Sequence, residues 1–322
     1  MARFLLRRLL QVVPVFFGAT FLIFALVYAV PGDPIEALAG DKPVAPAVRA
    51  ELRHRYHLDD PLLVRYGKYL QGLAHGDFGT NFRGRPVSEI MRQRFPVTIR
   101  LGVLAFLFEA VVGLAAGVLA GLRRRSLVDS LVLVSTTVVV AIPVFVLGYC
   151  AQLLLGVKLH WFPVVGIREG WRSYFLPAIV LGSLSLCYVA RLARASLVEA
   201  MRADYVRTAR AKGLPERRVV GVHALRNSLI PVVTFLGVDL GSLMAGAIVT
   251  EGIFNLPGIG QATFTAVHTQ EYPTVVGIVT ALVLIFILAN LLVDVLYAVL
   301  DPRIRWGSPR PRRTRLRRGR YR

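Results

Sequence analysis

Four polar side chains stand within or beside long apolar segments, and their placement is the strongest sign of chemistry in the sequence: Glu109, Asp239, Asn290 and Asp294. An ionised side chain at the centre of a membrane-spanning helix costs about 2.5–3.5 kcal/mol, so such residues usually face a cavity or a partner. For Asp239 and Asp294 we favour pairing with an arginine on a neighbouring helix or subunit over contact with a solute. For Glu109 we favour neither pairing nor solute contact over the other.

The motifs that catalysis would require are missing from the sequence. It contains no Gly-x-x-x-x-Gly-Lys-[Ser/Thr] phosphate loop, no Gly-x-Ser-x-Gly and no His-Glu-x-x-His. Only His54 and His57 have a spacing that could bring two imidazoles together, and two histidines alone do not make a metal site. Cys150 and Cys187 lie in apolar stretches, where a thiol behaves as a small hydrophobe. We therefore predict that this chain is not an enzyme, holds no metal and binds no cofactor of its own.

The elements that must position these residues are membrane helices. The chain is 55% hydrophobic with a mean hydropathy of +0.57, which is too apolar for a soluble protein of 322 residues. Its net charge of +20 does not indicate a nucleic-acid partner, because the basic residues cluster at the ends of apolar segments and in the C-terminal tail. That distribution is typical of membrane topology.

Runs of about 20 apolar residues can cross the hydrocarbon core of a bilayer as a helix. The sequence predicts an all-α polytopic membrane protein with six such spans, at approximately Leu9–Val30, Thr98–Leu122, Val128–Val157, Tyr174–Ala190, Ile230–Thr250 and Thr274–Leu300. The first is too long for a signal peptide and lacks a small-residue cleavage pattern, so we expect it to be retained. Pro143 lies near the middle of the third span and predicts a kink there.

Basic residues in short loops indicate which side of the membrane stays cytoplasmic. With the N-terminus inside, the cytoplasmic side holds the arginines of the first eight residues, Arg123 to Arg125, the dense stretch from Arg191 to Arg226 and the tail. The opposite orientation would translocate all of these, and would leave Glu251–Pro273, which has no Lys or Arg, in the cytoplasm. We therefore expect both termini to be cytoplasmic.

The connection between the fourth and fifth spans, Arg191–Leu229, is the most informative loop. Apolar residues at helical spacing predict an amphipathic helix whose apolar face includes Leu197, Met201 and Tyr205. Gly213 can end that helix in a left-handed cap, and Pro215 can open another. A basic amphipathic loop of this kind could also rest on anionic lipid head groups.

Two stretches of this loop resemble the coupling loop of binding-protein-dependent ABC permeases, in the variant of the dipeptide, oligopeptide and nickel branch: Asp204-Tyr205-Val206-Arg207-Thr208-Ala209-Arg210-Ala211-Lys212-Gly213-Leu214 and His223-Ala224-Leu225-Arg226-Asn227-Ser228-Leu229-Ile230-Pro231. The resemblance covers nearly the whole chain through further short motifs in the same order: Pro31-Gly32-Asp33-Pro34, Leu58-Asp59-Asp60-Pro61, Gly76-Asp77-Phe78-Gly79, Ala141-Ile142-Pro143, Glu251-Gly252-Ile253-Phe254, Pro257-Gly258, Asn290-Leu291-Leu292-Val293-Asp294 and Asp301-Pro302-Arg303-Ile304-Arg305. In one respect the chain departs from the general permease motif: Arg207, Thr208 and Ala209 stand where that motif has Glu-Ala-Ala.

The resemblance implies a type I ABC importer permease fold and a coupling role for the short helix around Asp204–Gly213, which would sit in a groove on a cytoplasmic ATPase. The residues implied in that contact are Asp204, Tyr205, Arg207, Thr208, Ala209, Arg210, Lys212, Gly213 and Leu214. Small Ala209, Ala211 and Gly213 would allow close approach, and the basic residues would supply charge. ATP and Mg would be bound by the partner subunits.

The resemblance divides the chain into a first helix with an exterior segment (1–97), a five-helix permease core (98–300) and a basic cytoplasmic tail (301–322). The expected protein is a multi-pass subunit of the bacterial inner membrane that forms half of a pathway for dipeptides or oligopeptides. Its expected partners are a second homologous permease, two ATP-binding subunits or domains, an extracytoplasmic solute-binding protein and membrane lipid, with no nucleic acid. Nickel complexes and haem stay open as solutes. A secondary transporter driven by an ion gradient is less favoured, because the intramembrane acids form no obvious relay and no inverted repeat is visible.

Overall fold

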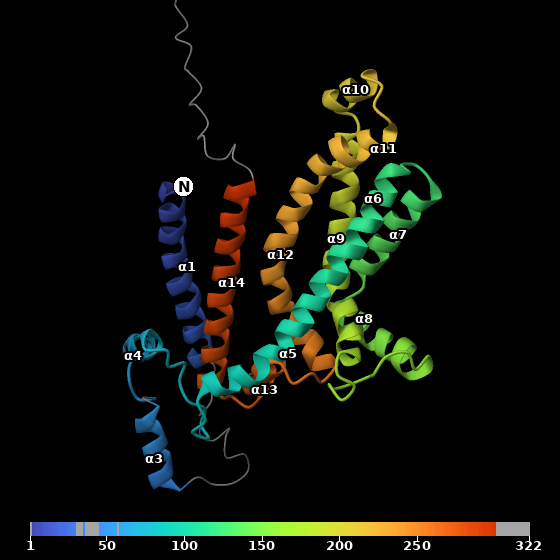
Figure 1. Ribbon diagram of the computed structural model, residues 1–322. Coiled ribbons are helices and arrows are strands. Elements are labelled where there is room, and N and C mark those ends of the chain that lie inside the picture. Colours follow the sequence, from blue (N-terminus) through green and yellow to red (C-terminus); the bar gives the residue numbers. More distant parts are fainter. Residues whose placement is uncertain (1, 30–34, 36–44, 57, 301–322) are drawn as a thin grey trace, which may run out of the picture.

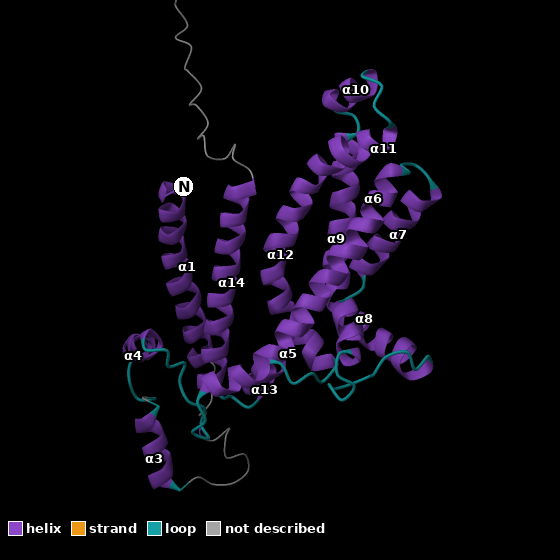
Figure 2. Cartoon of the chain, in the orientation of Figure 1, coloured by secondary structure: helices purple, strands orange, loops and turns teal. Residues whose placement is uncertain are grey.

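The computed structural model describes residues 2–29, 35, 45–56 and 58–300. Within these residues the chain is helical apart from its turns, with one isolated β-bridge between Thr80 and Pro86 (Figure 2). The helices are α1 Ala2–Ala29, α3 Pro46–Arg55, α4 Leu62–Ala74, α5 Val87–Phe108, η1 Glu109–Gly113, α6 Leu114–Leu122, α7 Leu127–Ala141, α8 Val144–Ala151, η2 Gln152–Lys158, α9 Arg172–Ala200, α10 Asp204–Ala211, α11 Glu216–Arg218, η3 Val219–Leu225, α12 Arg226–Ile253, α13 Ile259–His268 and α14 Tyr272–Leu300. The segments labelled η are π-helical.

Five helical stretches are long and apolar enough to cross a membrane, and a bent pair of helices makes up to six. The five are Leu10–Tyr28, Val87–Leu122, Arg172–Ala200, Glu216–Met244 and Tyr272–Leu291. Each predicted span overlaps one of these stretches or the bent pair. The all-α membrane fold expected from the sequence is therefore confirmed.

The second span begins eleven residues earlier than the sequence suggested, at Val87 instead of Thr98. Arg92, Arg94 and Arg100 interrupt the apolar pattern in this region, and Pro96 reads as a helix breaker. The helix nevertheless continues, because Val87, Met91 and Val97 are buried against neighbouring elements and anchor one of its faces. Its first turns belong to the predicted exterior segment, not to the permease core.

The predicted third span is broken at Pro143, and the two halves are bent by 105°. Ile142 is extended with φ −91° and ψ 126°, and Pro143 follows with φ −57° and ψ 139°. Proline disfavours a helical conformation in the residue before it, and two extended residues in succession turn the chain sharply. The kink expected at Pro143 is thus a full break.

Helix α9 is the centre of the bundle and packs against α5, α6, α7 and α12. Its contact with α6 depends on a missing side chain, since a Cβ atom at Gly117 would lie 2.7 Å from the Cβ of Ala193 and closer still to the carbonyl oxygen of Ala190. Small residues let membrane helices approach closely enough for van der Waals packing to hold them. At its last turns α9 is tied to α7 by an ion pair in which Arg194 Nη2 donates to Asp129 Oδ2 at 2.8 Å.

The ends of the molecule differ in what they carry (Figure 1). The N-terminus of α1, the C-terminal end of α14 and the helices α10 and α11 lie at one end. The helices α3, α4 and α13 lie at the other. Within the described residues, the segments that the sequence assigned to the cytoplasm are therefore gathered on one side, opposite those assigned to the exterior.

Candidate functional site

The short helix α10 stands beyond the ends of the long helices (Figure 1). Helix α9 stops at Ala200, and a tight turn follows in which the backbone N–H of Ala203 donates to the carbonyl of Ala200 at 3.1 Å. Ala203 is extended with ψ 151°, and α10 then begins with Asp204, whose negative charge suits the positive end of a helix dipole. The first helix expected in this loop, from about Leu197 to Gly213, is thus divided into the end of α9 and the separate helix α10.

The inner face of α10 is apolar and fixed to the body of the protein. Val206 is fully buried and Ala209 is 5% exposed. They belong to a cluster, here called the loop core, with Leu197, Ala200, Val219 and Ala224, against which Met201 and Leu214 also pack. Ala209 therefore faces its own chain, whereas the resemblance implied that it allows close approach to a partner.

The outer face of α10 is polar and open. Tyr205 is 41% exposed. It does not continue the apolar face of Leu197 and Met201 that the sequence suggested. The turn between α9 and α10 changes the helical phase and places Tyr205 on the outer face. Asp204 and Arg207 form an ion pair whose side chains are 87% and 73% exposed. The hydroxyl of Thr208 donates to the carbonyl of Asp204 at 3.0 Å. An exposed pair of this kind contributes little to stability, so these groups remain available to a partner.

Helix α10 ends in the left-handed cap that the sequence predicted at Gly213, where φ is +73°. The backbone N–H of Gly213 donates to the carbonyl of Arg210 at 2.9 Å, and that of Leu214 reaches the carbonyl of Ala209 at 3.4 Å. These two bonds are those of a Schellman motif, and the burial of Leu214 against the loop core supplies its usual apolar contact. A Cβ atom added at Gly213 would meet nothing within 4 Å.

An ion pair closes the turn that follows. Arg210 Nη2 donates to Glu216 Oε1 at 2.6 Å, and Arg210 Nε donates to Glu216 Oε2 at 3.1 Å. The bidentate geometry fixes the end of α10 to the start of α11. Arg210 therefore has a structural partner inside the loop, whereas Lys212, also exposed, has no ion pair among the described residues.

The polar residues expected within the membrane are divided between two places. Glu109 is completely buried at the start of η1, beside the carboxyl of Asp239 on α12 and the hydroxyl of Ser185. No hydrogen bond of standard geometry reaches either Glu109 oxygen or Asp239 Oδ2 within the described chain. The arginine partner suggested for Asp239 is not found among the described residues.

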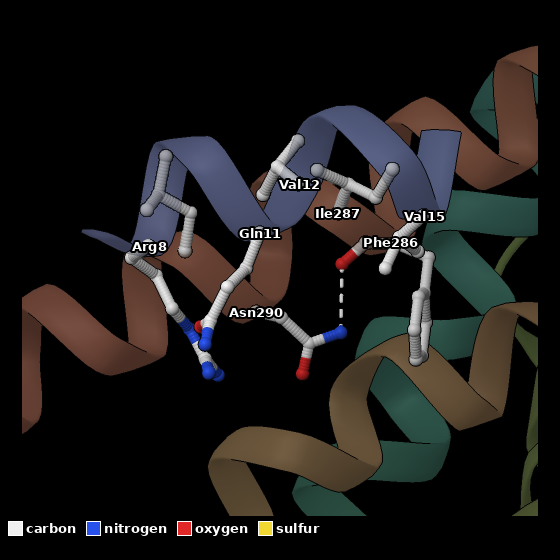
Figure 3. Close-up of a pocket in the computed structure, with 8 residues that line it drawn as sticks. Arg8, Gln11, Val12, Val15, Phe286, Ile287 and Asn290 are labelled. Atoms are coloured by element: carbon white, nitrogen blue, oxygen red, sulfur yellow. Dashed lines mark hydrogen bonds between the residues drawn. The ribbon is translucent and has the colours of Figure 1, made fainter. Parts of the chain in front are cut away.

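The other two polar residues lie on α14. Asn290 Nδ2 donates to the carbonyl of Phe286 at 2.9 Å and lines a groove beside α1 (Figure 3). Asp294 lies in the last turns of α14, where its side chain falls outside the described residues. The predicted set therefore does not come together as one site.

A buried hydrogen-bond network joins α5, α12 and α13 at the end of the bundle opposite α10. It was not identified from the sequence. Glu251, on α12, is completely buried, and its Oε1 accepts a hydrogen bond from the Thr98 hydroxyl of α5 at 2.5 Å. Its Oε2 accepts from the backbone N–H of Gln261 at 3.0 Å, and Thr98 Oγ1 accepts from the backbone N–H of Ile259 at 2.9 Å. Both side chains thus satisfy donors at the start of α13. An acid followed by Pro257 and Gly258 is the only local signal that could have indicated such a cap.

Comparison with known proteins finds matches along nearly the whole chain. Residues 113–306 match the family described as "Binding-protein-dependent transport system inner membrane component", and residues 1–102 match "Binding-prot-dependent transport system membrane comp, N-term". The di/tripeptide transport system permease protein DppB of Pseudomonas aeruginosa (strain UCBPP-PA14) is 40% identical, with 95% of this chain and 99% of that protein covered. The dipeptide transport system permease protein DppB of Escherichia coli (strain K12) is 39% identical, with the same coverage.

A third relative, the glutathione transport system permease protein GsiC of Salmonella paratyphi A, is 38% identical, with 95% of this chain and all of that protein covered. Full-length similarity at this level, together with the two family matches, agrees with the helical membrane fold and with the motif order in the sequence. The chain therefore belongs to the family of binding-protein-dependent transport system inner membrane components, the permease subunits of ABC importers.

Proposed function

We propose that this chain forms half of the translocation pathway of an ATP-driven importer of short peptides, and that α10 is its contact with the ATPase. The observation that carries the coupling role is the form of α10, which stands outside the bundle with a fixed apolar inner face and an open polar outer face. The two faces fit a helix that receives movement from a partner and passes it to α9 and α12.

Within α10 the proposed contact residues are those of the outer face and the cap: Asp204, Tyr205, Arg207, Thr208, Lys212 and Gly213. Arg210 and Leu214 support the contact from inside the loop, through the ion pair with Glu216 and the packing on the loop core. A helix resting on lipid head groups is the alternative. In that alternative the apolar face of the helix would meet lipid, whereas in this structure it is buried against the loop core.

The remaining machine is made of other chains. We assign ATP and Mg to two ATP-binding subunits or domains, the other half of the pathway to a second homologous permease, and solute capture to an extracytoplasmic binding protein. Glu109 is assigned a place in the protein interior beside Asp239, not a solute contact, because it is completely buried.

We also propose that both termini are cytoplasmic. The N-terminus, the basic turn at Arg123–Arg125 and α10 share one side of the molecule, where basic loops are retained during insertion. Segment Glu251–Pro273, without Lys or Arg, lies at the other.

Short peptides are the proposed solute because the permeases reported above serve di/tripeptide, dipeptide and glutathione transport. The test is uptake of a labelled dipeptide by proteoliposomes that contain this chain, its partner permease, the ATPases and the binding protein. Uptake should require ATP inside the cytoplasmic compartment. Uptake driven by an imposed ion gradient without ATP would support the secondary-transporter alternative and overturn the proposal.

A further inference from the structure

A groove between α1 and α14 opens at the end of the bundle that carries the N-terminus (Figure 3). Its volume is about 180 Å³. It is lined by Arg8, Gln11, Val12, Val15, Phe286, Ile287, Asn290 and Leu291. None of these residues belongs to the coupling loop, and none is Glu109 or Asp239.

The lining is polar at one end and apolar at the other. The polar ends of Arg8, Gln11 and Asn290 point to the same side of the groove, whereas Val15 and Phe286 lie farther along the helices (Figure 3). Val15 is 56% exposed and Phe286 is 42% exposed. The groove therefore offers hydrogen-bond donors and a positive charge beside an open apolar wall.

The polar end lies beside the start of the apolar stretch of α1. Arg7 and Arg8 stand directly before the apolar residues of this helix, whose candidate span begins at Leu10. Seven residues of helix separate Arg8 from Val15, so the apolar end lies about 10 Å deeper. Along α1, the change from polar to apolar lining follows the change from head group to hydrocarbon.

The size and charge of the groove select its occupant. Sites that enclose a small molecule usually measure roughly 300–1,000 Å³, so this groove cannot enclose a whole solute. It fits part of a molecule whose remainder lies in the bilayer. Arg8 already has an interaction within the chain, but a guanidinium carries five N–H donors and can also bind a phosphate.

We propose that this groove binds one anionic phospholipid, with its phosphate at Arg8 and Gln11 and the upper part of one acyl chain against Val12, Val15 and Phe286. Anionic lipids are attracted to basic residues at the cytoplasmic surface. The bound lipid joins α1 to α14 and so fastens the first helix to the rest of the permease. This proposal does not depend on the solute or on the coupling role of α10.

The experiment measures lipid retention by the purified chain in detergent, using native mass spectrometry after equilibration with equal amounts of phosphatidylglycerol and phosphatidylcholine. The unmodified chain should retain one phosphatidylglycerol in preference to phosphatidylcholine. Arg8→Ala should reduce that preference roughly tenfold, the effect of losing one charge-assisted hydrogen bond. Val12→Trp should displace both lipids by filling the groove.

Two matched variants control for general effects. Arg124→Ala removes an exposed arginine at the same end of the molecule, and Val13→Trp adds the same bulk to a side chain of α1 that is 50% exposed and outside the groove. Both should retain lipid as the unmodified chain does. Equal loss in Arg8→Ala and Arg124→Ala, or equal retention of the two lipids by the unmodified chain, would overturn the proposal.

A second measurement addresses the alternative that another protein covers the groove. Phosphatidylglycerol with a photoreactive acyl chain should label peptides of α1 and α14 in the assembled importer, and Val12→Trp should abolish that labelling. Labelling of these peptides in the isolated chain but not in the assembled importer would show that a partner subunit is the occupant, and would refute a lipid site.

Discussion

Valine at Gly213 should disrupt the proposed contact between α10 and the ATPase, so that solute uptake and stimulated ATP hydrolysis both fall. The residue has φ +73°, and a left-handed backbone costs an L-amino acid about 1–2 kcal/mol. A Cβ atom there would meet no atom of the chain within 4 Å, so alanine adds backbone strain alone. Valine adds a β-branched side chain that disfavours this conformation further. Any loss of function beyond the strain therefore reports on contact with another subunit.

A matched substitution separates strain from contact. Gly166 has nearly the same backbone, with φ +74°, and also has open space around its Cβ position, but it lies in the loop between η2 and α9 on the opposite side. Gly166→Val should lower the thermal unfolding temperature about as much as Gly213→Val does. Asparagine tolerates the left-handed region, so Gly213→Asn should preserve the cap while still adding bulk to the proposed contact.

The assay is ATP-dependent dipeptide uptake in reconstituted importers, together with ATP hydrolysis stimulated by the loaded binding protein. Both rates should fall together in Gly213→Val, fall less in Gly213→Ala, and stay near normal in Gly166→Val. Co-purification of the partner permease should be unchanged, because the membrane spans are untouched. Wild-type uptake by Gly213→Val would refute the coupling assignment of α10.

Four further outcomes are expected. Glu251→Gln should reduce the free energy of unfolding by about 1–3 kcal/mol, because one accepting oxygen becomes a donor and either the Gln261 N–H or the Thr98 hydroxyl loses its acceptor. Thr98→Ser keeps the hydroxyl and should be mild, and equal thermal unfolding temperatures for the two variants would contradict the network. Asp129→Ala should cost a similar amount by leaving Arg194 without its ion-pair partner, which a thermal unfolding scan against Arg194→Met would check. Truncation after Trp306 should leave uptake nearly intact, since a run of like charges attracts anionic lipid and needs no folded partner; loss of uptake at normal protein levels would show otherwise. The purified chain alone should hydrolyse no ATP, and turnover that survives removal of contaminating ATPases would count against this.

The spans were predictable because long apolar runs leave few alternatives in a bilayer. The Gly213 cap was predictable for a similar reason, since a glycine after a basic helical turn is a strong local signal. The start of α5 was not, because Arg92, Arg94 and Arg100 hide a helix that is held by contacts from other elements. Hydropathy along the sequence depends on composition, whereas the start of α5 depends on packing against other elements.

The orientation of side chains in the coupling loop was only partly predictable. A continuous helical phase placed Tyr205 inside, but the break after Ala200 shifts the phase, and Val206 takes the buried position. The network around Glu251 was missed because its partners are Thr98, more than 150 residues earlier, and the start of α13. Contacts over such separations leave no periodic trace in the sequence.

The helix that begins at Glu216 runs without a break in its helical backbone through η3 and α12 to Ile253. Its length is about 55 Å. The ion pair of Glu216 with Arg210 and the carboxylate of Glu251 therefore lie near opposite ends of one continuous helix. A tilt of about 10° at the α10 end displaces the far end by roughly 10 Å if the middle does not bend. Under the coupling role proposed for α10, a small tilt at a surface turn would therefore become, on the other side of the bilayer, a movement comparable to the width of a helix.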